Sequence, residues 1–168
     1  VMREVIMPTV NGMAAEGHPY TGFLYAGLMI DETGAPKVIE FNCRFGDPET
    51  QPIMMRLQSS LIELVEAGLA QQLPSEAQWD TRPAVGVVMA AGNYPNDVRK
   101  GDVIHGLNHV QTDSKVFHAG TSLKDGQVVT NGGRVLCVTA LGKTVSEAQA
   151  NAYRHLAQIT WTDEYHRT

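Results

Sequence analysis

The residues best suited to metal and phosphate chemistry lie in one strand-like run, residues 37–45. Glu40, Asn42 and Arg44 alternate with apolar residues or cysteine, so a β-strand would place the three side chains on one face. A carboxylate and an amide oxygen suit Mg²⁺, which takes few protein oxygens and completes its shell with water and substrate phosphates. An arginine beside them suits an anionic group. This pattern favours a metal-and-phosphate site.

An ordinary structural explanation stays open for the same residues. A half-exposed strand in a hairpin also carries polar side chains on its solvated face. The alternation predicts that Ile39, Phe41 and Cys43 share the opposite face, and we expect them to pack beneath a helix that begins near Pro52. The metal assignment fails if the carboxylate and the amide are buried among apolar residues or point to opposite sides of the sheet.

Two further groups of polar residues could bind substrate. Asp47 and Glu49 lie on a turn bounded by glycine and proline, where an acidic group could hold an amine. Acids at a helix N-terminus are equally well explained by the helix dipole. Residues 131–134 could present backbone N–H groups and the Arg134 guanidinium to a phosphate, although Asn-Gly between strands most often forms only a turn. Arg134 is therefore a secondary candidate.

Residues 1–72 predict a helix, a β-hairpin and a second helix. Tyr20–Ile30 and Lys37–Phe45 are largely apolar runs joined by the turn-forming residues Asp31–Gly34, which is typical of a hairpin. From Pro52 to Gly68, apolar residues recur at helical spacing, and we expect this helix to pack on the hairpin. A helix-like pattern also occupies residues 1–13.

Residues 84–168 predict a small antiparallel sheet or partial barrel covered by one helix. Tight turns separate short strand-like runs. The helix begins with a capping box, in which Glu147 follows Thr144 by three residues. The predicted strands are Ala84–Ala91, Lys115–Thr121, Val128–Thr130 and Arg134–Leu141, and the apolar stripe of the helix comprises Val145, Ala148, Ala152, Leu156 and Ile159.

Composition separates two domains and excludes several classes of partner. Residues 73–83 interrupt all periodicity and predict a linker between domains of residues 1–72 and 84–168.

The net charge of -5 lies entirely in residues 1–72 and has the wrong sign for binding nucleic acid or an anionic membrane surface. No apolar run is long enough to cross a membrane. The two cysteines, Cys43 and Cys137, predict free thiols and a cytoplasmic location.

The run from Glu40 to Gln51 resembles a known family. Glu-x-Asn-x-Arg at the end of a strand is similar to the magnesium-binding signature of ATP-grasp ligases. The continuation from Arg44, Arg-Phe-Gly-Asp-Pro-Glu-Thr-Gln, resembles the phosphoribosylamine–glycine ligases of purine biosynthesis, whereas biotin-carboxylase-like members continue with a run that ends in Glu-His. Less specific matches to the same ligases lie within residues 7–13, 20–28, 93–95, 100–107 and 130–136.

The resemblance implies an α+β fold: the second lobe of an ATP-grasp domain, followed by a small antiparallel β-rich C-terminal domain with a covering helix. It also implies that Glu40 and Asn42 bind the Mg²⁺ or Mn²⁺ that holds the phosphates of ATP. Arg44 would then neutralise charge on the transferring phosphoryl group. The implied reaction joins glycine to 5-phosphoribosylamine through glycyl phosphate and forms glycinamide ribonucleotide, ADP and phosphate.

The sequence opens at Val1 inside a helix-like pattern. The resemblance implies that an N-terminal domain and the first ATP-grasp lobe lie upstream of this residue, so we expect the isolated chain to be inactive. Two alternatives stay open. The parent protein could be another ATP-grasp carboxylate–amine ligase or carboxylase, or the chain could be an isolated binding module without activity.

Overall fold

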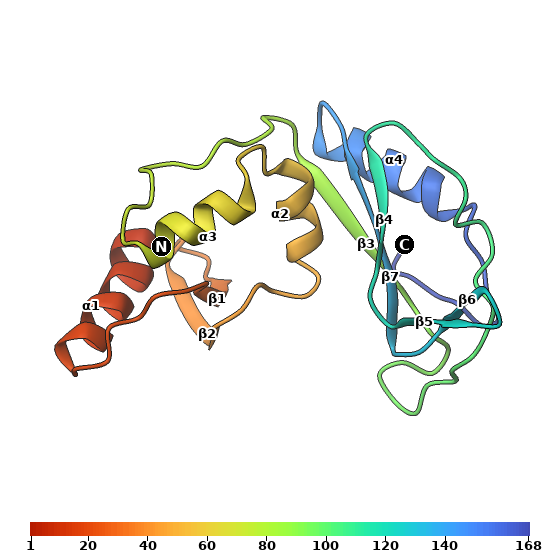
Figure 1. Ribbon diagram of the computed structural model, residues 1–168, viewed down its shortest axis with the longest axis horizontal. Coiled ribbons are helices and arrows are strands. Elements are labelled where there is room, and N and C mark those ends of the chain that lie inside the picture. Colours follow the sequence, from red (N-terminus) through yellow and green to blue (C-terminus); the bar gives the residue numbers. More distant parts are fainter. The chain divides into compact units, whose positions relative to one another are not determined.

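The computed structural model describes residues 1–168 and has an α+β fold, as the sequence predicts. The chain divides into two compact units (Figure 1). The first unit comprises Val1–Asp47 and Ser59–Ala77, and the second comprises Pro48–Gln58 and Gln78–Thr168. None of the helices has both the length and the apolar character needed to span a membrane.

The first unit contains a two-stranded antiparallel sheet and three helical segments. A π-helical segment leads directly into α1, and β1 pairs with β2 as the predicted hairpin. Ser60 caps the third helix, because its side chain accepts a hydrogen bond from the Glu63 backbone N–H. The bounds are Met2–Ile6 for the π-helical segment, Met7–Ala15 for α1, Tyr25–Ile30 for β1, Pro36–Asn42 for β2 and Leu61–Leu69 for α3.

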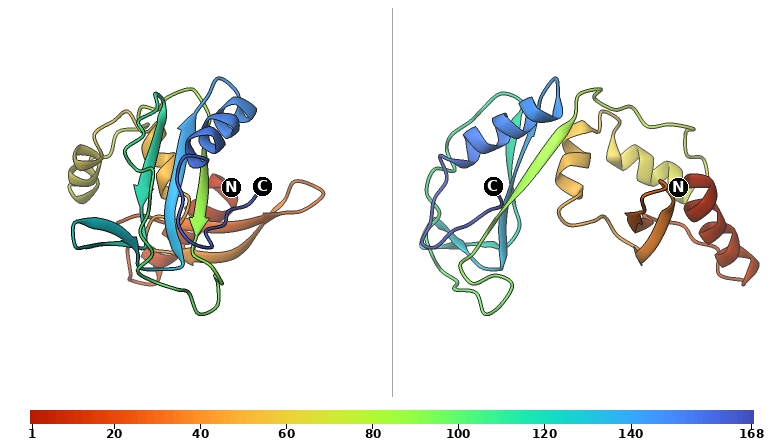
Figure 2. Two further views of the ribbon diagram at one scale, coloured as in Figure 1. Left: turned by 90° about the vertical axis from the view of Figure 1, so that its right-hand side faces the viewer. Right: turned by 180° about the vertical axis from the view of Figure 1, so that it is seen from behind.

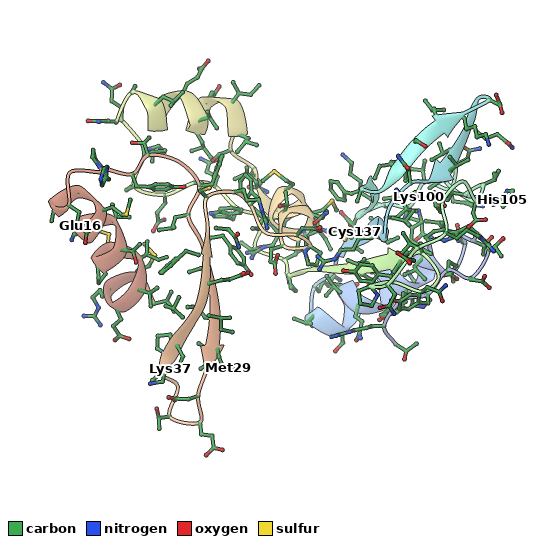
Figure 3. All side chains as sticks on the ribbon, turned by 90° about the horizontal axis from the view of Figure 1, so that it is seen from below. Glu16, Met29, Lys37, Lys100, His105 and Cys137 are labelled. Atoms are coloured by element: carbon green, nitrogen blue, oxygen red, sulfur yellow. The ribbon has the colours of Figure 1, made fainter.

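The Asp31 side chain organises the turn of this hairpin. Its Oδ1 accepts hydrogen bonds from the backbone N–H groups of Thr33 at 2.9 Å and Ala35 at 3.0 Å, and from the Thr33 hydroxyl at 2.6 Å. These bonds lower the pKa of Asp31, with the Thr33 hydroxyl as the largest cause. Met29 pairs with Lys37 just before the turn, and the two residues lie side by side near the tip (Figure 3).

The second unit is built on the antiparallel sheet β3-β7-β4, with the separate hairpin β5-β6. The predicted runs 84–91, 128–130 and 134–141 correspond to β3, β6 and β7, and the turn at Asp125-Gly126 is present as predicted. The single strand predicted over Lys115–Thr121 is wrong, because β4 ends at His118 and pairs with β7, whereas β5 begins at Thr121 and pairs with β6. The bounds are Thr50–Arg56 for α2, Ala84–Ala90 for β3, Ser114–His118 for β4, Thr121–Lys124 for β5, Gln127–Thr130 for β6, Arg134–Leu141 for β7 and Val145–Leu156 for α4.

Helix α4 covers one face of this sheet and forms the main core (Figure 2). In the capping box, the Thr144 hydroxyl accepts from the Glu147 backbone N–H at 3.2 Å, and the Glu147 carboxylate accepts from the Lys143 N–H at 2.8 Å. Val145 is 63% exposed, so its predicted place in the apolar stripe is wrong. The buried core includes Val87, Met89, Leu136, Val138, Ala152, Leu156 and Ile159.

Helix α2 packs on β3 and β7 of the second unit. A Cβ on Gly86 would lie 3.0 Å from Pro52 Cγ and 3.1 Å from Cys137 Sγ, so Pro52 rests directly on the sheet face opposite α4. The sequence does not predict this packing of α2 on β3 and β7. Gly86 lies in an otherwise apolar strand, and because it has no side chain it leaves the space that Pro52 occupies.

The single helix predicted from Pro52 to Gly68 is also wrong, since α2 ends at Arg56 and α3 starts at Leu61. Leu57 is extended and forms a β-bridge with Trp79, and the Gln58 N–H donates to the Gln78 carbonyl at 2.9 Å. Residues 57 and 58 therefore bond to residues 78 and 79 and do not continue the helix. Pairing with this distant segment overrides the helical pattern of apolar residues, which continues from α2 into α3.

Candidate functional site

Glu40 and Asn42 lie on the same face of β2, as the alternation predicts. In the antiparallel register, Asn42 pairs with Tyr25 and Glu40 pairs with Gly27. Glu40 is exposed and Asn42 is half-buried. The two side chains therefore neither point to opposite sides nor lie within an apolar core.

Gly27 makes room for the Glu40 side chain. A Cβ on Gly27 would lie 2.9 Å from Glu40 Cγ, 3.6 Å from a Glu40 carboxylate oxygen and 3.6 Å from a ring carbon of Tyr25. The Glu40 side chain thus lies across the glycine, and its carboxyl group and the Tyr25 ring approach the same point. Sequence reasoning missed Gly27 and Tyr25. Two signals could have found them: both lie in the matching stretch 20–28, and a glycine within an apolar strand marks close approach of a neighbouring group.

Arg44 lies beyond the end of β2, which stops at Asn42 instead of continuing to Phe45. Its Nη1 donates to the Phe45 carbonyl at 2.8 Å, and the side chain is exposed. The strand ends because β1 starts only at Tyr25, not at Tyr20, and so offers no partner for residues after Asn42. The predicted extent of both strands is wrong, and pleat alternation does not govern where Arg44 points.

The apolar face predicted beneath a helix is not buried. Ile39 is 66% exposed, Phe41 is 44% exposed and Cys43 is also exposed. Ile39 is the extra residue of a β-bulge, because Gly27 pairs with Glu40 while Leu28 pairs with Val38. The predicted packing of these side chains beneath a helix is wrong, because all three are exposed. Cys137, in contrast, is buried in β7.

Asp47 and Glu49 lie on the turn that precedes α2, and both are exposed. Asp47 closes a stretch of the first unit, whereas Glu49 belongs to the second unit as the N-cap residue of α2. The predicted turn and the predicted helix N-terminus are both present. Their position is compatible with amine binding and with stabilisation of the helix dipole.

Arg134 begins β7 and contacts Tyr94. Its Nε donates to the Tyr94 hydroxyl at 2.9 Å, and its guanidinium carbon lies 5.9 Å from the centre of the tyrosine ring. Gly133 packs closely on the same ring. Tyr94 therefore positions the Arg134 side chain, and its place among the motif residues 93–95 is the only signal for it in the sequence.

The donor set of the first unit fits a hard cation. Glu40 and Asn42 offer carboxylate and amide oxygens from one strand face, and Gly27 keeps the space beside Glu40 free of a side chain. No group of three or more histidine, cysteine, aspartate or glutamate side chains lies together in the chain. A cation held by these two oxygens would complete its shell with other ligands, as Mg²⁺ does with water and phosphates.

Comparisons with known proteins match both parts of the chain. Residues 84–168 match the family described as "Phosphoribosylglycinamide synthetase, C domain". Residues 1–50, which include Glu40, Asn42 and Arg44, match "Phosphoribosylglycinamide synthetase, ATP-grasp (A) domain". The motif around Glu40 and the C-terminal sheet thus fall in two domains of one described family.

Curated relatives named phosphoribosylamine–glycine ligase are similar over nearly the whole chain. The protein from Pseudomonas aeruginosa is 68% identical over 99% of the chain, and the protein from Escherichia coli is 64% identical over 96%. The chain spans only 39% and 38% of the length of these two relatives.

Solved structures agree with these matches. The crystal structure of phosphoribosylamine–glycine ligase from Thermotoga maritima superposes with a TM-score of 0.83 at 36% identity, covering 99% of this chain and 41% of that one. The N5-carboxyaminoimidazole ribonucleotide synthetase of the same organism is similar in fold alone, with a TM-score of 0.61 at 17% identity, covering 93% of this chain and 41% of that one. This chain belongs to the phosphoribosylglycinamide synthetase family.

Proposed function

We propose that the chain provides the metal-and-phosphate side of the active site in a phosphoribosylamine–glycine ligase. The observation that carries the proposal is the shared face of Glu40 and Asn42 on β2, with Gly27 leaving room beside the carboxylate. The same residues lie within the stretch that matches the ATP-grasp domain of the family. An ordinary solvated strand would not need a glycine opposite the carboxylate.

In this proposal, Glu40 and Asn42 hold Mg²⁺ or Mn²⁺ together with the phosphates of ATP. The bound metal ion neutralises phosphate charge and polarises the transferring phosphoryl group. Arg44, exposed just beyond β2, places a permanent positive charge near the transferring γ-phosphoryl group. Catalysis of this type depends on positioning and electrostatic stabilisation, so no covalent protein nucleophile is required.

The proposed reaction has two steps. The carboxylate of glycine attacks the γ-phosphorus of ATP, which releases ADP and forms glycyl phosphate. The amine of 5-phosphoribosylamine then attacks the acyl carbon and displaces phosphate, giving glycinamide ribonucleotide. Asp47 and Glu49 are the proposed contacts for an amine, and Arg134, oriented by Tyr94, is the proposed contact for a phosphate.

The remaining assignments are also proposals. We divide the chain into domains of residues 1–72 and 84–168 with a linker at 73–83, a division supported by family matches to residues 1–50 and 84–168. We propose that other parts of the parent polypeptide complete the ATP site, since the relatives are much longer than this chain. Two free cysteines support a cytoplasmic location.

The test is glycine-dependent ADP formation by the full-length parent protein that contains this chain. We expect turnover that requires ATP, a divalent metal ion, glycine and 5-phosphoribosylamine, and no detectable turnover by residues 1–168 alone. Full-length protein that forms ADP equally well without glycine would overturn the proposed substrate. Clear turnover by residues 1–168 would overturn the proposed division of the site.

A further inference from the structure

A pocket of about 440 Å³ lies within the second unit, apart from the residues assigned above. Its volume falls in the range of pockets that hold small organic ligands. The lining is mainly apolar, with one cationic side chain and one large aromatic ring. The lining residues are Pro52, Ile53, Arg56, Trp79, Pro83 and Ala84.

Arg56 is held in a fixed position at this pocket by neutral groups. Its Nε and Nη2 donate to the Asp80 carbonyl at 3.2 and 3.1 Å, and the Asp80 N–H donates to the Arg56 carbonyl at 2.7 Å. This reciprocal pairing joins α2 to the segment before β3. It leaves the guanidinium Nη1 without a protein acceptor.

The Asp80 carboxylate does not form an ion pair with Arg56. Both Asp80 carboxylate oxygens accept from Arg82, whose Nη2 lies 2.8 Å from Oδ2, and Arg82 also pairs with Asp113 at 3.0 Å. The Asp80 carboxylate is therefore hydrogen-bonded to Arg82, and the Arg56 charge acts on it only through space, where it helps to lower the pKa of Asp80. Arg56 forms no ion pair within the chain, and its charge is available to an anionic ligand.

Trp79 supplies an open aromatic surface beside that charge. Its backbone is held by the β-bridge to Leu57, and Trp79 is 43% exposed. An exposed tryptophan on a fixed backbone next to two proline rings offers a preorganised stacking surface. A ligand that stacks on it loses little of the protein's conformational freedom.

We propose that this pocket binds a planar aromatic anion, with its ring against Trp79 and its carboxylate or phosphate on Arg56. The combination of one guanidinium that has no ion pair with one exposed indole ring selects this class over neutral aromatic compounds and over simple inorganic anions. The site is independent of the proposed ligase reaction. It uses no residue assigned to metal, ATP or substrate.

The experiment uses the two tryptophan side chains, Trp79 and Trp161, as reporters in the 168-residue chain. Their indole N–H signals are followed by NMR during titration, and a Trp79→Phe variant assigns them. Trp161 is 7% exposed and serves as the internal reference. Benzoate and benzamide have nearly the same shape and differ in charge, so this pair tests whether binding needs a negative charge. Phenyl phosphate and inorganic phosphate both carry a phosphate group, so this pair tests whether binding needs the aromatic ring.

We expect benzoate and phenyl phosphate to shift the Trp79 signal in a saturable way and to bind about tenfold more tightly than benzamide, the effect of one charge-assisted hydrogen bond. Inorganic phosphate should leave the signal unchanged. Equal affinity for benzoate and benzamide, or no saturable shift with either aromatic anion, would overturn the proposal. The affinities in this comparison are measured on the unmodified chain, and the variant serves only to assign the two signals.

A pair of arginine variants tests the position of the anion. Arg56→Gln removes the charge in the pocket, and Arg154→Gln removes an exposed arginine on α4 whose guanidinium donates to Asn151 at 2.8 Å. Arg56→Gln should weaken benzoate binding about tenfold and leave benzamide unchanged. Arg154→Gln should change neither. Equal benzoate affinity in the two variants would overturn the assignment of Arg56.

Discussion

Gly27 and Glu40 face each other across the β1-β2 ladder, and a Cβ on Gly27 would lie 2.9 Å from Glu40 Cγ. Cβ atoms almost never approach another carbon that closely, so the Glu40 side chain can adopt its observed conformation because residue 27 is a glycine. The proposed metal ligand therefore depends on a residue with no functional group of its own.

Gly27→Ala should displace the Glu40 carboxylate without changing its charge. In the full-length ligase we expect a loss of turnover on the order of tenfold or more, because small displacements of positioning groups are costly in catalysis. The metal concentration needed for half-maximal turnover should rise as well. Steady-state rates measured over a metal titration check both expectations.

Gly12→Ala is the matched control for this substitution. Gly12 lies in α1, and a Cβ there would meet nothing within 4 Å. Its substitution should leave both the rate and the metal dependence unchanged. Equal kinetic effects of the two variants would show that the space at Gly27 is irrelevant to the site.

Stability should depend on pH through the Asp80–Arg82 pair. The Arg82 side chain, followed by the Arg82 backbone N–H, lowers the pKa of Asp80 from 3.8 to about 2. A carboxylate whose pKa falls on folding stabilises the fold above its ordinary pKa, and that contribution disappears as the pH falls through the folded-state pKa. We therefore expect Asp80→Asn to lower Tm at neutral pH and this difference to shrink between about pH 4 and pH 2.

Thermal unfolding across this pH range tests the pair, with Asp97→Asn as the control. Asp97 is exposed and the structure shows no ion pair for it, so its substitution should leave the Tm curve close to that of the parent chain. A Tm difference for Asp80→Asn that stays constant from neutral pH to pH 2 would argue against the ion pair as its cause.

The capping box of α4 should contribute measurably to the second unit. Thr144→Ala removes the hydroxyl that accepts from the Glu147 N–H and should lower the free energy of unfolding by about 1 kcal/mol. Val145→Ala, at a 63% exposed position, should change it by less than about 0.5 kcal/mol. Denaturant titrations measure both values, and equal losses would mean that the cap is not what stabilises the helix start.

Sequence patterns predicted the second unit well because its signals are local. β3 and β7 are largely apolar runs that pair directly with each other, and the Asp125-Gly126 turn joins the strands of the β5-β6 hairpin. The Thr144 cap correctly located the start of α4. The exposed Val145 was missed because a stripe on a helical projection does not show where the sheet ends.

The first unit and α2 were harder to predict because their boundaries depend on contacts between distant residues. The helix break at Leu57 comes from pairing with Trp79, and the place of α2 comes from the space above Gly86. Neither contact leaves a periodic signal. The bulge at Ile39 likewise follows from the pairing of β2 with β1, so simple alternation misplaced the apolar side chains around it.

The part of the candidate site that lies within strand β2 was predictable from the sequence. Glu40 and Asn42 share a face because both lie inside β2, whereas Arg44 lies beyond its end, where alternation no longer applies. The space that Gly27 leaves beside Glu40 depends on the antiparallel register that pairs these two residues, and residue types alone do not specify this register. Motif resemblance identified the family correctly because Arg44–Gln51 is a specific run, independent of these packing details.

Substitution of Glu40 in the full-length ligase tests the central claim most directly. Glu40→Ala removes the proposed ligand charge and should lower kcat on the order of 100-fold or more, whereas Cys43→Ala, at an exposed position three residues away, should leave kcat nearly unchanged. Steady-state kinetics with saturating ATP and metal ion give both values. A large loss for Glu40→Ala alone is the predicted result, and equal, small effects of the two substitutions would contradict the metal-and-phosphate role of β2.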